Sequence, residues 1–101
     1  MAEKRKVVLT KLANEHISRI HQFFIDEKDE VFAAELMDDF LDVVFGAIAR
    51  FPEQFPVCIG IRSNSPDYRI ASMKGDFRVI YQILKDKILI LMIIHESELP
   101  F

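Results

Sequence analysis

Residues 68–95 of the chain read YRIASMKGDFRVIYQILKDKILILMIIH. β-Branched, aliphatic and aromatic residues dominate this stretch, a composition typical of β-strands. Short breaks interrupt the apolar pattern at Met73–Asp76 and at Lys85–Asp86, and breaks of this length match the tight turns between antiparallel strands. The stretch therefore predicts three strands joined by two turns. A further short edge strand is predicted at Val57–Arg62, between residues that disfavour a central position in a sheet.

The lengths of the two turns predict which residues face one another. A two-residue second turn places Arg78 opposite Ile93 in the last two strands. A four-residue first loop places Ala71 opposite Arg78. A change of one residue in that first loop would move the strand at 68–72 to the opposite face of the sheet.

In this register, one face of the sheet is almost wholly apolar. Burying apolar side chains of this size contributes about 1.5–3 kcal/mol each, so most of the stability is expected to come from this face. Helices that precede the stretch must cover it, because no other segment of the chain could. The side chains of this face are Tyr68, Ile70, Phe77, Val79, Tyr81, Ile83, Ile88, Ile90, Met92 and Ile94.

The opposite face combines polar side chains with large aliphatic ones. Its polar members are Arg69, Arg78, Gln82 and His95. Its aliphatic members, here called the aliphatic patch, are Ile80, Leu84, Leu89, Leu91 and Ile93. A patch of this size exceeds what a monomer normally leaves exposed, so a partner protein is expected to cover it. The alternative is that the irregular segments and the tail Glu98–Phe101 fold over it.

Two amphipathic helices are predicted between a short strand at Lys6–Thr10 and Pro52. In the first helix, apolar residues begin with the pair Leu12 and Ala13 and then recur in steps of three and four to Phe24. The second helix runs from about Glu30 to Arg50 and ends before the proline. Its apolar stripe is Ala34, Met37, Leu41, Val44 and Ile48, widened by Phe40 and Phe45. The predicted fold is α+β, a two-layer sandwich with a helix hairpin on one face of a mostly antiparallel sheet.

Composition and charge argue against several classes of protein. The 101 residues, half of them hydrophobic, predict a single domain over residues 1–101. The net charge of −3 disfavours nucleic-acid binding by bulk electrostatics. The longest apolar run, Ile88–Ile94, is too short to span a membrane, and no signal-peptide pattern is present. The single Cys58 is expected to be a small buried hydrophobe, and we expect a cytoplasmic protein with no metal, cofactor or membrane association.

Four basic side chains in or near the sheet could carry chemistry. Arg69, Arg78 and His95 share the second face, where diagonal cross-strand neighbours lie about 7–8 Å apart, close enough to hold one phosphate. Arginine offers a planar fork to phosphate oxygens, and histidine acts as a general acid or base near neutral pH. Lys74, in the first turn, adds a further positive charge. The alternative is that the arginines pair with nearby carboxylates such as Glu96 and only solvate the sheet.

The order of these elements resembles the RelE/ParE superfamily of toxins from bacterial type II toxin–antitoxin systems. The resemblance covers nearly the whole chain, and it implies the element order β-α-α-β-β-β(-β) with the first strand beside the last. The residues that carry it are Val7–Thr10 before the helix hairpin, the Phe51-Pro52 stop, Tyr68-Arg69-Ile70, the segment Gly75–Tyr81 and the strand closing on His95.

The superfamily has two branches with different activities. The RNA-cleaving branch, similar to RelE, holds ribosome-bound mRNA on the open sheet face. Arg69 and Arg78 match its basic positions, Lys74 is a looser match, and His95 stands where that branch often has a histidine on the last strand. The ParE-like branch keeps the fold, lacks the nuclease residues and poisons DNA gyrase. After the histidine this chain has the acidic tail Glu96–Phe101, where RNA-cleaving relatives carry Arg and Tyr, and this difference favours the ParE-like branch.

The leading hypothesis is therefore a ParE-like toxin of a plasmid-stabilisation, or addiction, module that binds an essential target such as DNA gyrase. A cognate antitoxin is expected to neutralise it by covering the aliphatic patch, and a homodimer or a heterotetramer with the antitoxin would fit this role. The rival hypothesis is a ribosome-dependent mRNA endoribonuclease. Its catalytic residues would be Arg69, Arg78 and His95, with Lys74 and the arginines binding RNA. A third hypothesis is a degenerate, non-toxic member that only binds a partner protein.

Overall fold

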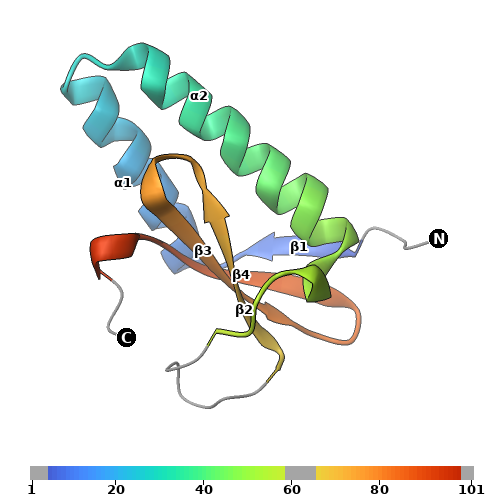
Figure 1. Ribbon diagram of the computed structural model, residues 1–101. Helices are drawn as coiled ribbons and strands as arrows, with labels where there is room; N and C mark the ends of the chain where they lie inside the picture. The colour runs from blue at the N-terminus through green and yellow to red at the C-terminus, as the bar shows by residue number, and fades with distance from the viewer. Residues whose placement is uncertain (1–4, 59–65, 99–101) are drawn as a thin grey trace.

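The computed structural model describes residues 5–58 and 66–98 of the chain. Its helical run continues past α2 as a π-helical segment, Asp42–Ile48. The main elements are β1 (Lys6–Leu9), α1 (Lys11–Asp26), α2 (Glu30–Leu41), β2 (Tyr68–Met73), β3 (Phe77–Ile83) and β4 (Lys87–His95) (Figure 1).

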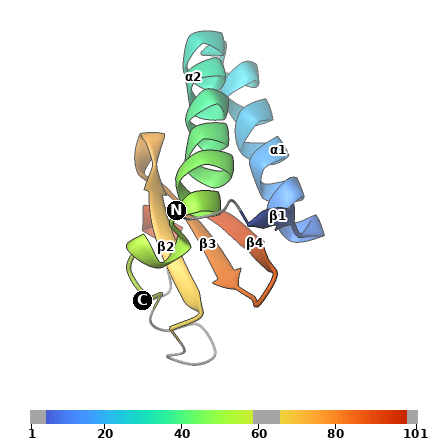
Figure 2. The ribbon, with the colours of Figure 1, turned by 90° about the vertical axis from the view of Figure 1, so that its right-hand side faces the viewer.

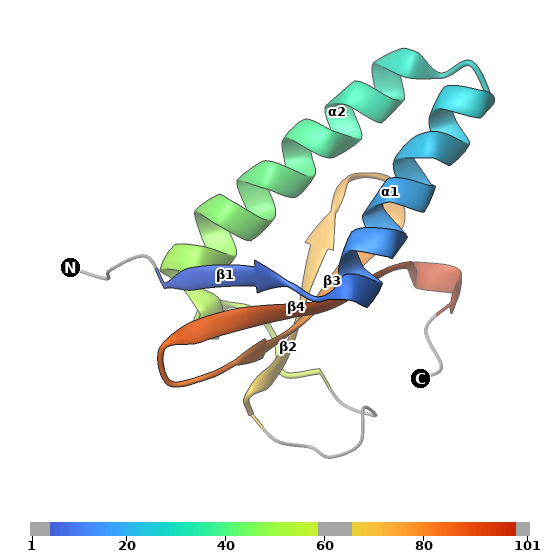
Figure 3. The same cartoon turned by 180° about the vertical axis from the view of Figure 1, so that it is seen from behind.

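The four strands form one sheet in the order β1-β4-β3-β2. β1 runs parallel to β4, and the other neighbours are antiparallel. Figure 3 shows β1 beside β4, where the chain passes directly into α1. Both helices lie on one face of the sheet (Figure 2). The predicted two-layer α+β sandwich is therefore confirmed, as is the placement of the first strand beside the last.

Side-chain caps fix where both helices begin. Thr10 Oγ1 accepts a hydrogen bond from the Ala13 N–H (3.2 Å) and donates one to the Ile90 carbonyl (2.8 Å). A threonine at this position satisfies one of the free N–H groups of the first helical turn, and here it also attaches α1 to β4. Asp29 caps α2 by accepting from the Phe32 N–H (3.3 Å).

The second helix buries a different stripe from the predicted one. Ala34 and Leu41 were expected to face the core, but both are exposed, and Leu41 keeps 48% of its surface open. The predicted positions Phe40, Val44 and Ile48 are buried. A π-helical turn holds about one residue more than an α-helical turn, so the segment 42–48 keeps Val44 and Ile48 on the face that packs against the sheet. The buried stripe is Ala33, Leu36, Phe40, Val44 and Ile48.

Tyr81 lies at the centre of the core with none of its surface exposed. Its hydroxyl donates to the Pro52 carbonyl at 2.6 Å and so ties the end of the helical run to the sheet. Burial raises the pKa of the Tyr81 phenol, because an anion would have to form in an apolar surrounding. The hydroxyl therefore stays protonated and remains a donor in the folded protein.

Tyr81→Phe is expected to lower the free energy of unfolding by about 1–3 kcal/mol, since the Pro52 carbonyl loses its donor. The raised pKa of Tyr81 also predicts a pH dependence. The phenol of the unfolded chain has a pKa of about 10, so this stabilisation is complete below that pH and is lost as the pH rises from there through the folded pKa. Urea unfolding at neutral and alkaline pH measures both effects. An equal alkaline loss of stability in Tyr81→Phe and the wild type would contradict the assignment.

The pairing of β2 with β3 differs from the prediction by one residue. Met73 pairs with Phe77, so the loop between the strands is the three-residue turn Lys74–Asp76. Gly75 and Asp76 both take positive φ (77° and 61°), which allows the tighter turn. Ala71 consequently pairs with Val79 rather than with Arg78. Each side chain of β2 therefore lies on the face of the sheet opposite to the predicted one.

The pairing of β3 with β4 begins as predicted and then shifts. Tyr81 pairs with Ile90 and Ile80 pairs with Met92, which leaves Leu91 as an extra residue in a β-bulge. The Thr10 hydroxyl contacts the carbonyls of both Ile90 and Leu91 at this point. Every residue of β4 beyond the bulge lies on the face opposite to the one predicted.

Together the short turn and the bulge redistribute side chains between the two faces. Tyr68, Ile70, Met92 and Ile94 leave the predicted apolar face for the open face, whereas Arg69, Ile93 and His95 move to the helix face. Strand residues that lie under the helices are Val7, Leu9, Arg69, Ala71, Met73, Phe77, Val79, Tyr81, Ile83, Ile88, Ile90, Ile93 and His95.

In the described part of the predicted edge strand, Val57 forms a single bridge with Arg69. Residues 59–62 of that prediction lie outside the described part of the chain. Cys58 is buried, as predicted, and burial raises the pKa of its thiol. None of the helices within residues 5–58 and 66–98 has the length and apolar character needed to cross a membrane.

Candidate functional site

Arg69 is bound to main-chain carbonyls on the helix side of the sheet. Its Nη1 donates to the carbonyls of Glu53 (3.0 Å) and Phe55 (2.8 Å). Its Nε donates to the carbonyl of Pro66 (2.8 Å). A guanidinium offers donors in one plane, and here they hold two connecting segments against β2. The predicted position of Arg69 on the open face was wrong, because the three-residue turn reverses the faces of β2.

Arg78 lies on the open face, as predicted, and is paired there. Its Nη2 lies 3.2 Å from Glu96 Oε2, and its Nη1 donates to the Phe77 carbonyl at 3.2 Å. The ion pair with Glu96 is the arrangement that the alternative hypothesis predicted for this arginine. Across the sheet its neighbours are Ser72 and Ile94, so no second cation stands beside it there.

His95 lies on the helix face, beyond the bulge. Its ring packs edge-on against Phe77, with 5.2 Å between the ring centroids. Its Nδ1 accepts from the Ser97 N–H at 3.2 Å and lies 2.8 Å from Ser97 Oγ. The predicted convergence of Arg69, Arg78 and His95 on one face was therefore wrong, since only Arg78 faces the open side.

Lys74 contacts α2 and does not lie beside the other basic residues. Its Nζ forms an ion pair with Glu35 Oε2 at 3.0 Å and lies over the Phe32 ring, 5.8 Å from the centroid. Its backbone N–H donates to Asp39 Oδ2 at 2.7 Å. These contacts hold the β2–β3 turn against the helix, so the predicted phosphate-binding set is not brought together.

The aliphatic patch is smaller than predicted. Ile80 is 1% exposed and Ile93 is 2% exposed, and the bulge places Ile93 in the core under the helices. Leu84, Leu89 and Leu91 are half-buried. The larger exposed apolar side chains among the described residues instead lie on the helices and just after them. They are Leu12, Phe23, Val31, Leu41, Phe45 and Phe51.

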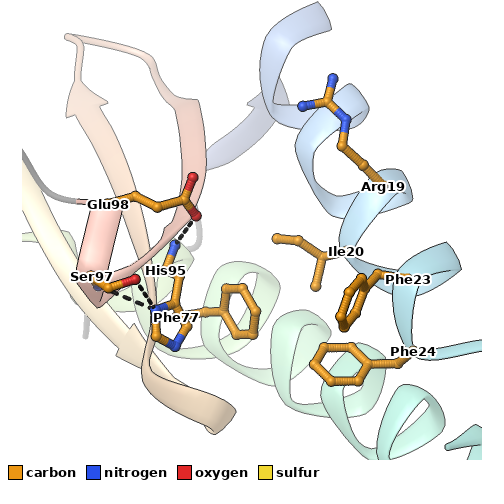
Figure 4. A pocket seen from close by; sticks show the side chains of 8 residues that line it. All are labelled: Arg19, Ile20, Phe23, Phe24, Phe77, His95, Ser97 and Glu98. Atoms are coloured by element: carbon orange, nitrogen blue, oxygen red, sulfur yellow. Dashed lines mark hydrogen bonds between the residues drawn. The ribbon is translucent and has the colours of Figure 1, made fainter. Parts of the chain in front are cut away.

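A mostly apolar cleft of about 500 Å³ opens between α1 and the end of β4. In Figure 4, Ile20, Phe23 and Phe24 form the wall on the helix side, facing Phe77 and His95 across the opening. Phe24 meets both Phe23 and Phe77 edge-on, with centroid distances of 5.1 and 6.3 Å. The rim is polar and consists of Arg19, Ser97 and Glu98.

A smaller cavity of about 120 Å³ continues the cleft toward His16 and Ile93. It shares Arg19, Ile20 and Glu98 with the larger one. This cleft was not predicted from the sequence, because it depends on the bulge that turns His95 toward α1. The sequence contained one signal of it. Phe23 and Phe24 are adjacent on one helix, so their side chains point in different directions and cannot both pack fully into the core of the domain.

The described residues contain no group of three or more His, Cys, Asp or Glu side chains placed to hold a metal ion. The described site instead offers an apolar cleft with a polar rim and one paired arginine on the open sheet face. Such an arrangement is suited to binding another protein through buried apolar side chains.

Comparisons with known proteins agree with this architecture. Residues 7–100 match the family model described as the ParE toxin of the type II toxin–antitoxin system parDE. The chain is similar in structure to the chromosomal ParDE toxin–antitoxin system from P. aeruginosa, with a TM-score of 0.69 and 17% identity over 91% of this chain and 96% of that one. It is also similar to the RelBE2 toxin–antitoxin complex from Mycobacterium tuberculosis, with a TM-score of 0.61 and 19% identity over 92% and 99% of the respective chains. No curated protein matches the sequence.

Proposed function

Because the chain belongs to the ParE family of toxins of type II toxin–antitoxin systems, we propose that it acts by binding DNA gyrase and does not cleave RNA. The observation that carries this proposal is the separation of the basic residues. A nuclease that lacks a metal ion needs its acid, base and phosphate-binding groups within hydrogen-bond reach of one scissile bond. In this chain Arg78 and His95 lie on opposite faces of the sheet.

Charge at the end of β4 supports the same proposal. Glu96 pairs with Arg78, and Glu98 follows two residues later. An RNA-binding surface needs cations free to meet phosphates. A carboxylate 3.2 Å from the Arg78 guanidinium competes with any phosphate for the same donors. The open face is therefore poorly suited to hold mRNA.

The toxin is proposed to act in the cytoplasm, where its target works, and to be kept inactive by a cognate antitoxin. Solved complexes of structurally similar proteins contain toxin and antitoxin together. The exposed apolar side chains of the helices, Phe23 in particular, give such a partner large surfaces to bury.

Arg78→Ala is expected to leave growth arrest unchanged when the chain is induced alone in bacteria. The reason is that, within residues 5–58 and 66–98, the polar partners of the Arg78 guanidinium are Glu96 and the Phe77 carbonyl. Breaking such a half-exposed pair changes the free energy of unfolding by about 1 kcal/mol or less. Colony counts after induction and the integrity of cellular mRNA are the measurements. The RNA-cleaving function would instead be established if the wild type arrested growth and cleaved mRNA and the Arg78→Ala variant did neither.

A further inference from the structure

Charge is distributed unevenly along the chain. Residues 26–42, which span the tip of the helix hairpin and the whole of α2, contain eight acidic residues and one basic residue. This segment therefore carries a net charge of −7, whereas the whole chain carries −3. The other residues consequently carry a net charge of +4. A protein with this asymmetry has a preferred direction of approach to a charged partner.

Part of the positive charge lies where β1 meets the turn between β3 and β4. Lys6 pairs with Lys87 on the neighbouring strand, and Lys85 stands in the turn. Figure 3 shows the start of β1 and this turn at the same end of the sheet, far from the tip of the helix hairpin. These three residues, here called the lysine patch, are therefore well separated from the acidic segment.

The lysines of β1 and β4 point to the open face of the sheet. Val7 and Ile88 pack on the helix side, and successive side chains of a strand point to opposite faces. Lys6 and Lys87 thus stand side by side on the open face, on strands about 4.8 Å apart. Like charges placed opposite each other on neighbouring strands destabilise a sheet. An anion bound between these two ammonium groups would offset that repulsion.

Carboxylates in the described part of the chain leave the lysine patch unneutralised. None of the three ion pairs there involves a residue of the patch. Glu53 is occupied by Arg5, the residue before Lys6, at 3.4 Å. Asp86 lies in the same turn as Lys85 and forms no ion pair with it. The three ammonium groups are therefore free to meet an anion from another molecule.

The residue type favours phosphates as that anion. Lysine is depleted in interfaces between proteins, whereas its flexible point charge is a common binder of phosphates. The proposed target, DNA gyrase, acts on DNA and therefore presents the phosphates of a duplex. Two or three phosphate contacts give only weak binding by themselves, and the net charge of −3 opposes binding to free nucleic acid. The patch is thus suited to DNA that gyrase already holds.

We propose that the lysine patch contacts phosphates of the DNA duplex held by gyrase, while other surfaces of the toxin bind the gyrase protein. The acidic segment at residues 26–42 then faces away from the DNA, which selects one orientation of the toxin on the complex. The patch lies at the opposite end of β4 from the ion pair of Arg78 with Glu96. This inference rests on the proposed function and adds a second component, DNA, to the target.

The test measures the affinity of fluorescently labelled toxin for gyrase alone and for gyrase saturated with a linear DNA duplex. At about 50 mM salt the wild type is expected to bind the gyrase–DNA complex roughly tenfold more tightly, since each phosphate contact contributes about threefold. Between about 50 and 200 mM salt, two such contacts steepen the salt dependence by a slope of about 2. Lys6→Gln combined with Lys87→Gln is expected to lose both differences and to bind gyrase alone as the wild type does.

A charge-matched control combines Arg19→Gln with Lys28→Gln. Both residues are exposed on the helix hairpin, outside the lysine patch. Each double variant loses two positive charges, which changes the net charge from −3 to −5. The control is expected to keep the tighter binding to the gyrase–DNA complex, because the patch is intact. Melting curves of both double variants establish that they are folded.

The DNA contact would be overturned, with the toxin function left intact, if the wild type bound both forms of gyrase equally. It would also be overturned if the lysine variant kept the tighter binding to the DNA complex or lost affinity for gyrase alone. Loss of the tighter binding in the control would assign the effect to net charge and would equally contradict a contact at the patch. If the wild type bound neither form of gyrase, the proposed function itself would fail.

Discussion

Replacing Arg69 with alanine is expected to lower the free energy of unfolding by about 3 kcal/mol. Hydrogen bonds from a charged donor contribute about 1.5–3 kcal/mol each, and solvation of the freed carbonyls offsets part of the loss. Arg69 donates to the carbonyls of Glu53, Phe55 and Pro66. For a domain of this size the change corresponds to a fall in Tm of roughly 10–20 °C. Thermal unfolding followed by circular dichroism measures it. Arg69→Lys should recover little, since an ammonium cannot reach the same acceptors in one plane.

A matched control is Arg19→Ala, which removes an exposed arginine without an ion pair among the described residues. Its free energy of unfolding is expected to change by less than about 0.5 kcal/mol.

Growth arrest and thermal unfolding of Arg69→Ala together separate a structural role of Arg69 from a chemical one. If Arg69→Ala abolished growth arrest while its melting curve matched that of the wild type, Arg69 would be a functional residue and the structural role would be wrong.

Gly75→Ala is expected to destabilise the protein by about 2–3 kcal/mol. Gly75 has a φ of +77°, a left-handed conformation that costs a residue with a Cβ about 1–2 kcal/mol. A Cβ at this position would also lie 2.8 Å from Phe32 Cζ, so the ring that supports Lys74 must shift. Urea unfolding of the variant measures the loss.

Gly46→Ala is the control for this prediction. Gly46 lies in the π-helical segment, and a Cβ there would meet nothing within 4 Å. Alanine in a helical segment is expected to be neutral or to stabilise by up to about 1 kcal/mol. Equal stability of Gly75→Ala and the wild type would mean that the turn tolerates another conformation, and the reason given for the register of β2 would fail.

The architecture could be predicted from the sequence because long apolar patterns determine it. The helix hairpin follows from apolar repeats of three and four, and the last three strands of the sheet follow from two short turns. The registers could not be predicted in full. The turn at Lys74–Asp76 depends on a positive φ at Asp76, which is a non-glycine residue. The bulge at Leu91 lies where the hydroxyl of Thr10, a residue distant in sequence, contacts the carbonyls of Ile90 and Leu91.

The candidate site shows how a shift of one residue changes a functional hypothesis. The ion pair of Arg78 with Glu96 could be anticipated, because both charges lie near the ends of adjacent strands. The predicted cluster of Arg78 with Arg69 and His95 is absent, because the three-residue turn and the bulge each shift the register by one residue. Such a shift places the side chains of the strand on the opposite face of the sheet. The same bulge turns His95 toward α1 and makes it part of the cleft.

The most direct measurement is a supercoiling assay with purified DNA gyrase and the purified chain, run beside an mRNA-cleavage assay in a translating extract. The binding mechanism proposed for this ParE-family toxin predicts that gyrase supercoiling is inhibited while the mRNA stays intact. A heat-unfolded sample of the chain is the control and should leave gyrase active. Unchanged supercoiling together with cleaved mRNA would contradict the account.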